Sequence, residues 1–150
     1  MIVLGLVLVG NAGNAYAVVS TKAKPKVKPY PYVRIFYYQE GKNAKKSFFS
    51  HPKSIDVFAP QSYTLDADGI LNGSVDADLL KFARKNKIKV MPLITNRRFS
   101  ESSAHALLDD PASQDVAIAA LIAEARDLRY WGWQFDFEQM DVSYRDKYSA

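Results

Sequence analysis

The sequence contains no cysteine, and this absence excludes several kinds of structure and chemistry. A chain without thiols has no disulfide framework, no thiolate metal site and no cysteine nucleophile. It also lacks the G-x-G-x-x-G fingerprint and the phosphate loop that mark nucleotide-binding α/β proteins. Its two histidines, His51 and His105, fall in predicted loops without a clustered second ligand, so we expect no metal site and no cofactor.

Acidic residues are absent from the one segment that makes the chain basic. The 150 residues include 20 Lys and Arg against 16 Asp and Glu, which gives a net charge of +4. Four of the lysines, Lys22, Lys24, Lys26 and Lys28, form one short run, and without them the two signs balance. A basic face of the kind that binds nucleic acid is therefore not supported, and we expect no nucleic-acid partner.

The sequence has no apolar run of the ~20 residues needed to span a bilayer. Ile2–Val9 is a short apolar core that is followed by the A-x-A pattern of Ala15–Ala17. This arrangement predicts a signal peptide at 1–17, although no Lys or Arg follows Met1. A first buried strand is the alternative. If the segment is a signal peptide, the mature protein is secreted or periplasmic and has no membrane span.

Residues 18–31, VVSTKAKPKVKPYP, are rich in Lys and Pro and lack apolar periodicity. Such a composition predicts an extended, solvated linker. A tether to an anionic surface or a wall polymer is the alternative to a plain spacer. Residues 32–150 then remain as one ordered domain, which is a normal length for a single core.

The domain alternates predicted strands with predicted helices. Strands are expected at 32–39, 55–63, 88–96 and within 130–141, because these segments are β-branched or aromatic. Pro92 lies inside the third of them and indicates a bulge or a strand end. The Asp66–Gly69 segment, DADG, predicts a tight turn rather than a calcium loop.

Two helices have clear start signals. One is capped by Ser74 or Asp76 and runs to about Asn86, with its apolar side toward the core. The other begins at Asp110-Pro111, a cap followed by proline at the first helical position. It continues with apolar residues at helical spacing, namely Ile118, Leu121, Ile122, Ala125 and Leu128.

Apolar strands separated by helices predict a parallel sheet covered by helices, which is the α/β class. A closed eight-stranded TIM barrel needs about 200 residues or more. This chain supplies only about four strands, so we expect the N-terminal half of a (β/α)8 TIM barrel.

The fourth strand, in YWGWQFDFEQMD, combines aromatic rings with polar groups at alternate positions. Because strand side chains alternate faces, one face carries the rings of Trp133, Phe135 and Phe137 and the other carries Gln134, Asp136 and Glu138. In a barrel the polar face would point inward, with Glu138 at the carboxyl-terminal mouth, where active sites form. A protonated Glu138 there can act as a general acid, while the deeper Asp136 could orient a polar substrate group or share the proton. Solvated strand-end acids and an internal hydrogen-bonded pair are the alternatives.

The segment GWQFDFE, with Trp131 before it, resembles the D-G-x-D-x-D-x-E motif of glycoside hydrolase family 18. This family includes chitinases and bacterial cell-wall and spore-cortex N-acetylglucosaminidases. The segments IDVFAPQSYTLDADG, KVMPLITN and LLDDPASQDVAIAALI are similar to its second strand and hairpin, its third strand and the helix that follows. The similarity covers roughly residues 32–150, and only the fourth-strand motif is specific to the chemistry.

The resemblance implies a role for each motif position. Glu138 matches the general acid/base, and Asp136 matches the aspartate that orients the substrate's N-acetyl group, which is the internal nucleophile. Two positions depart from the motif, because Trp131 and Gln134 stand where the family has aspartates. Gln134 can still hydrogen-bond Asp136, although it could weaken a proton relay.

Three further residues are candidates for substrate contact. Gln61 and Tyr63 lie where the second strand meets its loop and could line a sugar subsite, with ordinary packing as the alternative. Asn96 ends the third strand and could hydrogen-bond near the site, or it could form a turn. Trp133 should face the helices, where core packing explains it better than sugar stacking does.

These observations predict an exported glycosidase that cleaves β-1,4-linked N-acetylglucosamine polymers, either chitin or peptidoglycan, by a retaining mechanism. The family's later substrate-holding residues lie beyond residue 150, so we expect the isolated chain to be inactive. A non-catalytic barrel that binds the same polysaccharides is the first alternative. An interaction module tethered by the Lys/Pro linker is the second.

Overall fold

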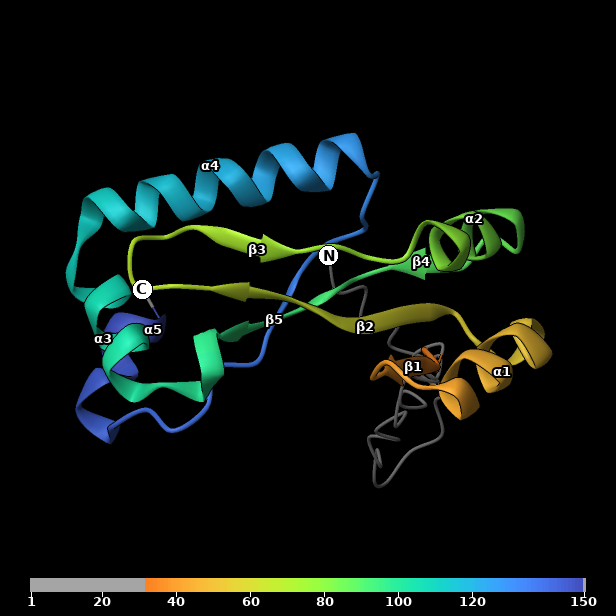
Figure 1. The fold of residues 1–150 in the computed structure, drawn as a ribbon, viewed down its shortest axis with the longest axis horizontal. Helices are drawn as coiled ribbons and strands as arrows, with labels where there is room; N and C mark the ends of the chain where they lie inside the picture. Colours follow the sequence, from red (N-terminus) through yellow and green to blue (C-terminus); the bar gives the residue numbers. More distant parts are fainter. Residues whose placement is uncertain (1–31, 150) are drawn as a thin grey trace, which may run out of the picture. The chain divides into compact units, whose positions relative to one another are not determined.

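The computed structural model describes residues 32–149 (Figure 1). The signal peptide predicted at 1–17 and the linker predicted at 18–31 lie outside these residues. Within the described range, no helix has the length and apolarity needed to cross a membrane.

The centre of the fold is a sheet whose main path is β1–β2–β5–β6. Its strands are β1 (Ile35–Tyr38), β2 (Val57–Leu65), β5 (Leu93–Asn96) and β6 (Gln134–Phe135), and each pairs in parallel with the next. Two short strands flank β2: β3 (Leu71–Gly73) is antiparallel to it and β4 (Lys89–Val90) is parallel.

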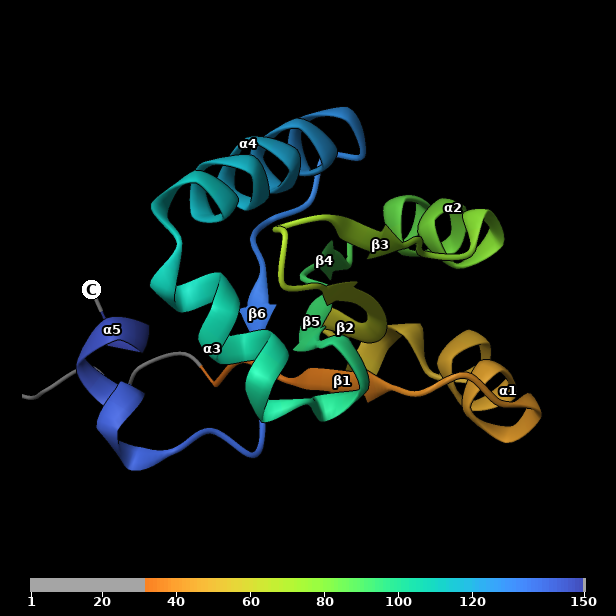
Figure 2. The same ribbon diagram turned by 60° about the vertical axis from the view of Figure 1, so that its left-hand side comes forward.

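Helices connect these strands. The α-helices are α1 (Lys42–Ser50), α2 (Ala77–Lys85), α3 (Glu101–Asp109), α4 (Pro111–Asp127) and α5 (Arg145–Ser149). Three short 3-10 turns complete the chain: η1 (Pro52–Ser54), η2 (Arg97–Phe99) and η3 (Val142–Tyr144). Figure 2 shows α1, α2 and α4 along one side of the sheet.

The strand order confirms the predicted fold class. Parallel strands that follow one another in space in chain order, with helices on one side, are the arrangement of a singly wound barrel. A doubly wound sheet would reverse its order at a switch point, and none occurs along this path. In the described residues the sheet stays open between β1 and β6.

Pro92 divides the predicted third strand in two. β4 ends at Val90 and β5 begins at Leu93. Proline has no N–H to donate to the sheet, but its carbonyl accepts a bond of 2.9 Å from the Gln134 N–H. The break therefore falls where a ladder donor is missing, as the sequence indicated.

Both predicted helix starts are confirmed. Asp76 caps α2 by accepting the Asp78 N–H at 2.7 Å. Asp110 caps α4 by accepting the N–H groups of Ala112 and Ser113, each at 3.2 Å. Helices α1 and α3 were not predicted, and α3 contains His105, so the prediction that this histidine lies in a loop is wrong.

The predicted turn at 66–69 is also confirmed, and it connects β2 to β3. Asp66 accepts the N–H groups of Asp68 and Ile70. Gly69 has φ +77°, and a Cβ there would lie 2.0 Å from the carbonyl oxygen of Ser113. Glycine is required because the turn packs directly against the first turns of α4.

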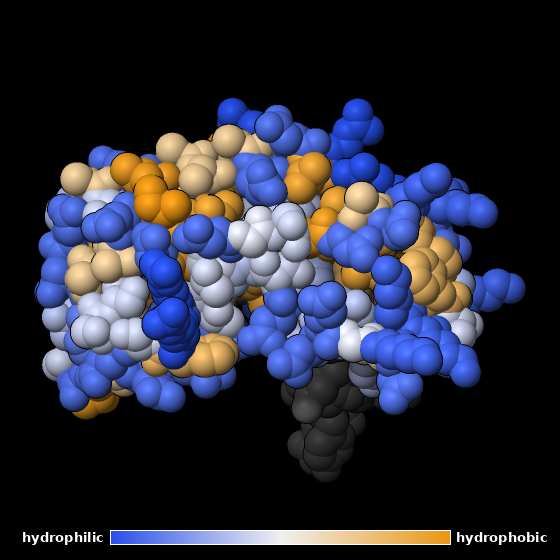
Figure 3. All heavy atoms as spheres, in the orientation of Figure 1, coloured by the Kyte–Doolittle hydropathy of each residue, from blue (hydrophilic) through white to orange (hydrophobic). Residues whose placement is uncertain are grey.

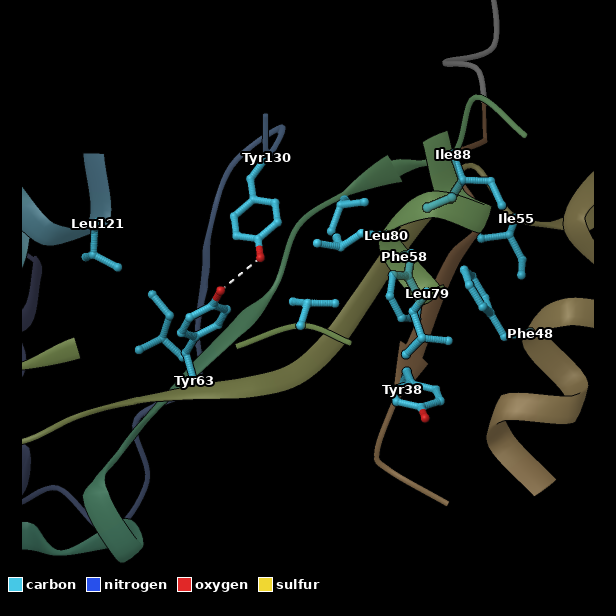
Figure 4. Close-up of a cluster of buried hydrophobic side chains, with 14 of the residues drawn as sticks. Tyr38, Phe48, Ile55, Phe58, Tyr63, Leu79, Leu80, Ile88, Leu121 and Tyr130 are labelled. Carbon is cyan, nitrogen blue, oxygen red and sulfur yellow. Dashed lines mark hydrogen bonds between the residues drawn. The ribbon is translucent and has the colours of Figure 1, made fainter. Parts of the chain in front are cut away.

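The hydrophobic core lies between the sheet and the helices. Phe48 of α1 stacks on Phe58 of β2 with ring centroids 4.1 Å apart, and both side chains are fully buried (Figure 4). On α4, Leu121 is buried, whereas Ile118 and Ile122 are half exposed. Apolar side chains accordingly gather on the surface over α4 in Figure 3.

Candidate active site

A bulge in β2 decides which side chains share a face. Gln61 pairs with Leu93, but the next pair is Tyr63 with Ile94, so Ser62 is an extra residue. Partners in a parallel pair point to the same side of the sheet, and Leu93 and Ile94 point to opposite sides. Gln61 and Tyr63 therefore lie on opposite faces, although they are two residues apart.

Gln134 and Gln61 lie on the inner face, away from the helices. Gln134 pairs with Leu93, which is also the partner of Gln61. The Gln134 side-chain amide donates to the Tyr37 hydroxyl of β1 at 3.0 Å. This bond reaches across the inner face from one end of the sheet path to the other, so the predicted inward direction of Gln134 is confirmed.

Trp133 lies on the helix side, as predicted. Its indole N–H donates to the Leu121 carbonyl of α4 at 3.1 Å. Its ring meets those of Tyr63 and Tyr130 edge to face, with centroids 5.0 Å and 5.2 Å away. Trp133 is thus a packing residue between β6 and α4.

Asp136 follows Gln134 on the inner face. Its N–H donates to the Ile94 carbonyl at 2.9 Å, so strand pairing continues one residue beyond β6. Regular pairing preserves the alternation, and Asp136 shares the side of Gln134. Its side chain is half-buried near the carboxyl end of the sheet.

Glu138 is exposed and lies beyond the regular strand, which is shorter than predicted. Its backbone is held by Asn96 instead of by a strand neighbour. The Glu138 N–H donates to the Asn96 amide oxygen at 3.0 Å, and the Asn96 amide nitrogen donates to the Glu138 carbonyl at 3.1 Å. Glu138 is therefore fixed in its backbone while its carboxylate faces solvent.

Asn96 does not fit the predicted role of a substrate contact. It is 1% exposed, and besides its two bonds to Glu138 its amide nitrogen donates to the Ser100 carbonyl at 3.0 Å. All of its polar atoms are used within the protein. We assign it a positioning role instead.

Tyr63 does not fit a sugar contact either. It is 2% exposed, and its hydroxyl donates to Glu124 of α4 at 2.6 Å and lies 2.9 Å from the Tyr130 hydroxyl (Figure 4). Burial and these bonds raise the pKa of Tyr63 far above its usual value. The bulge at Ser62 is the physical reason, since it turns Tyr63 toward the helices.

Gln134 leaves one buried polar atom without a partner. Its Oε1 is the one buried side-chain oxygen or nitrogen in residues 32–149 that has no hydrogen bond. A buried acceptor of this kind is costly unless a donor meets it.

A cluster that the sequence did not reveal anchors the chain after Glu138. The His105 ring of α3 stacks on Tyr144 at 3.5 Å between centroids. The Tyr144 hydroxyl donates to Asp109 at 2.6 Å, and Lys147 also pairs with Asp109. Lys147 and Tyr144 lower the pKa of Asp109. A sequence signal for α3 is its N-cap, Ser100, whose hydroxyl accepts the Ser103 N–H.

Within the part of the chain that the structure describes, no group of three or more Asp, Glu or His side chains could hold a metal ion. The arrangement can support proton transfer by Glu138 and polar orientation by Asp136. Gln61 and Gln134 can add hydrogen bonds from the same inner face.

Comparison with known proteins gives structural matches only. No family model matches the chain, and no curated protein matches it. A chitinase from Chromobacterium violaceum superposes with a TM-score of 0.70 and 25% identity, over 78% of this chain and 38% of that one. The Bacillus cereus spore cortex-lytic enzyme SleL gives a TM-score of 0.68 and 20% identity, over 77% and 29%. A class V chitinase from Pseudomonas fluorescens gives 0.69 and 17%, over 76% and 37%.

These matches confirm the resemblance at the level of the fold. The chain has the architecture of part of a chitinase-type TIM barrel, and it spans less than two fifths of the length of these three structures.

Proposed function

We propose that the chain forms one side of a glycoside hydrolase that cleaves β-1,4-linked N-acetylglucosamine polymers, chitin or peptidoglycan. The observation that carries the proposal is the placement of the two acids. Asp136 lies on the inner face at the carboxyl end of the sheet, and Glu138 follows with a fixed backbone and a free carboxylate. Export, predicted from residues 1–17, would bring the protein to such polymers.

In the proposed reaction the substrate supplies the nucleophile. Asp136 accepts a hydrogen bond from the acetamide N–H and orients the acetamide oxygen toward the anomeric carbon. That oxygen forms a bond to the carbon as the glycosidic bond breaks, and Glu138 gives its proton to the leaving oxygen. Water then attacks the anomeric carbon, opens the cyclic oxazolinium ion and loses its proton to Glu138. The proton restores the acid, and this second displacement restores the anomeric configuration.

Gln134 changes how Asp136 is supported. A glutamine can exchange hydrogen bonds with its neighbours but cannot take up a proton from Asp136. Its amide is already oriented by Tyr37 at 3.0 Å. In the proposed enzyme Gln134 links β6 to β1 below Asp136. Gln61 is a candidate for a sugar contact on the same face.

The test is a substitution of Glu138 in the complete barrel. Glu138→Gln should lower turnover of a chitin oligosaccharide about 10²–10⁴-fold, because the proton donor is lost. Sugar binding and thermal stability should be unchanged. Glu101→Gln, which removes an exposed carboxylate from α3, is the matched control and should keep full turnover. Equal turnover in wild type and Glu138→Gln would refute the proposal.

A non-catalytic barrel that binds the same polysaccharides is the second candidate. It is favoured by Gln134, an amide at a position where the similar motif has an acid. This candidate predicts that the wild-type barrel binds chitin or peptidoglycan fragments without releasing products. Isothermal titration together with a reducing-end assay separates the two candidates.

A further inference from the structure

A cavity of about 500 Å³ lies at the amino-terminal edge of the sheet, at the opposite end from Asp136 and Glu138. Its residues come from the segments that lead into the strands. Arg34 precedes β1, Lys53 lies in η1 before β2, Lys87 and Lys89 lie at β4, and Trp131 precedes β6. This volume is in the range of small-molecule sites.

The lining of the cavity has an excess of positive charge, because four basic residues line it against one acid. Its one acid, Asp56, forms an ion pair with Arg34, whose Nε and Nη2 donate to it at 2.9 Å and 2.8 Å. Lys53, Lys87 and Lys89 form no ion pair with any carboxylate in residues 32–149. Residues 1–31 contain no Asp or Glu. Three lysines without a carboxylate partner in the described residues therefore line the cavity.

Trp131 adds an aromatic wall. Trp131 is 55% exposed. The Lys89 ammonium lies 4.1 Å from the ring centre, where a cation–π contact holds it. Trp131 therefore adds an exposed aromatic ring to the lining of the cavity.

Lys87 has a backbone conformation that favours glycine. It has φ +58° and follows the last residues of α2. Its N–H donates to Arg84 and the next N–H donates to Ala83, a pattern in which glycine is the usual residue at this position. A lysine here costs stability relative to glycine.

We propose that this cavity binds an acidic sugar, with its phosphate or carboxylate between Lys53, Lys87 and Lys89 and its ring against Trp131. The concave shape and the single cluster of cations fit one compact anion. A nucleic-acid strand would need cations along an extended track. The inference does not depend on the proposed hydrolase, because it uses none of the residues of that site.

The acidic sugar could be free or could be a unit of an anionic polymer. Titration of the full chain with glucose 6-phosphate tests the first source, and trigalacturonate tests the second, with tryptophan fluorescence and calorimetry as readouts. Binding of either probe at low salt supports the site, and the tighter probe identifies the source. Binding of neither, or equal binding of neutral chitotriose at the same residues, overturns it.

Matched glycine variants separate binding from stability. Lys87→Gly should raise the melting temperature, because the left-handed backbone is relieved, and weaken probe binding at least tenfold. Arg129→Gly is the control, since Arg129 has φ +50° after α4 but does not line the cavity. It should raise the melting temperature and leave binding unchanged. Equal loss of binding in both variants would contradict the proposal.

Two further variants complete the test. Lys53→Gln, at an exposed position in η1, should weaken binding without changing stability. Replacement of Lys22, Lys24, Lys26 and Lys28 by serine should leave binding intact. If the serine variant instead abolishes binding, or if a single-stranded DNA 12-mer binds more tightly than both sugars, the cavity is not the acidic-sugar site.

Discussion

Two buried polar side chains, Asn96 and Tyr63, connect the elements around the candidate acids. Asn96 and Tyr63 were candidates for sugar contact, and both are buried and bonded within the protein. Asn96 links the end of β5 to the backbone of Glu138, while Tyr63 links β2 to α4 through Glu124. Each residue acts on the site through position and stability rather than through direct contact.

Asn96→Ala should destabilise the fold by about 2–3 kcal/mol, because it removes three part-buried hydrogen bonds to the backbone of Ser100 and Glu138. It should also loosen the Glu138 segment. Chemical denaturation measures the first effect. Asn72→Ala is the control, since Asn72 is exposed and its change should stay within about 0.5 kcal/mol. An unchanged free energy of unfolding in Asn96→Ala would show that the hydrogen bonds of Asn96 do not stabilise the fold.

Tyr63→Phe should cost about 1–2 kcal/mol, because Glu124 and Tyr130 lose a buried partner. It should not change affinity for a chitin oligosaccharide, because Tyr63 faces the helices. The measurements are denaturation and calorimetric titration, with Tyr37→Phe on the inner face as the comparison. Lost affinity at unchanged stability would restore the predicted sugar contact of Tyr63.

At the scale of elements, the β2–β3 hairpin shows how one turn fixes a helix. The Asp66–Gly69 turn is closed by Asp66, and Gly69 lies against the start of α4. Helix α4 in turn covers Trp133 and Tyr63. The hairpin therefore helps to place the helix that supports β6.

Gly69→Ala should destabilise the protein by more than about 2 kcal/mol. The added Cβ would lie 2.0 Å from the Ser113 carbonyl oxygen, and φ +77° strains any side chain. Gly132→Ala provides a control, because a Cβ at Gly132 meets nothing within 4 Å. Thermal melts of the two variants test the prediction. Similar melting temperatures for both would mean that the hairpin does not press on α4.

At the scale of the molecule, the sheet is covered on its helix side and open along its β1–β6 edges in the described residues. Ile118 of α4 and Phe135 of β6, both about half exposed, line one apolar groove with Leu121 and Phe137. The two ends of the strands also differ chemically. The carboxyl end carries Asp136 and Glu138, and the amino end carries the lysine cavity.

The ion pair of Arg34 and Asp56 makes stability depend on pH. Arg34 holds the pKa of Asp56 well below its usual value of 3.8, so the pair stabilises the fold above about pH 4 and is lost as the pH falls further. Asp56→Asn should therefore lower the melting temperature at pH 7 and have a smaller effect below pH 4. Asp68→Asn, at an exposed turn position, should show no such trend. A pH-independent effect of Asp56→Asn would contradict this assignment.

The sequence by itself determined the fold class, the cap at Asp110, the turn at 66–69 and the alternation of Trp133 with Gln134, and it limited the cap of α2 to Ser74 or Asp76. These features depend on neighbours in the chain, on backbone donors within a few residues, and on the two-residue period of a strand. They could therefore be predicted without coordinates.

Only the tertiary structure decided where Tyr63 and Asn96 lie. It also brought together the residues that line the cavity at the amino-terminal edge of the sheet. The bulge at Ser62 shifts the register between β2 and β5, and no local sequence pattern predicted it. Asn96 and Glu138 are 42 positions apart, and the cavity joins the starts of separate strands. Contacts of this kind arise only when the strands come together, because their partners are distant in the sequence.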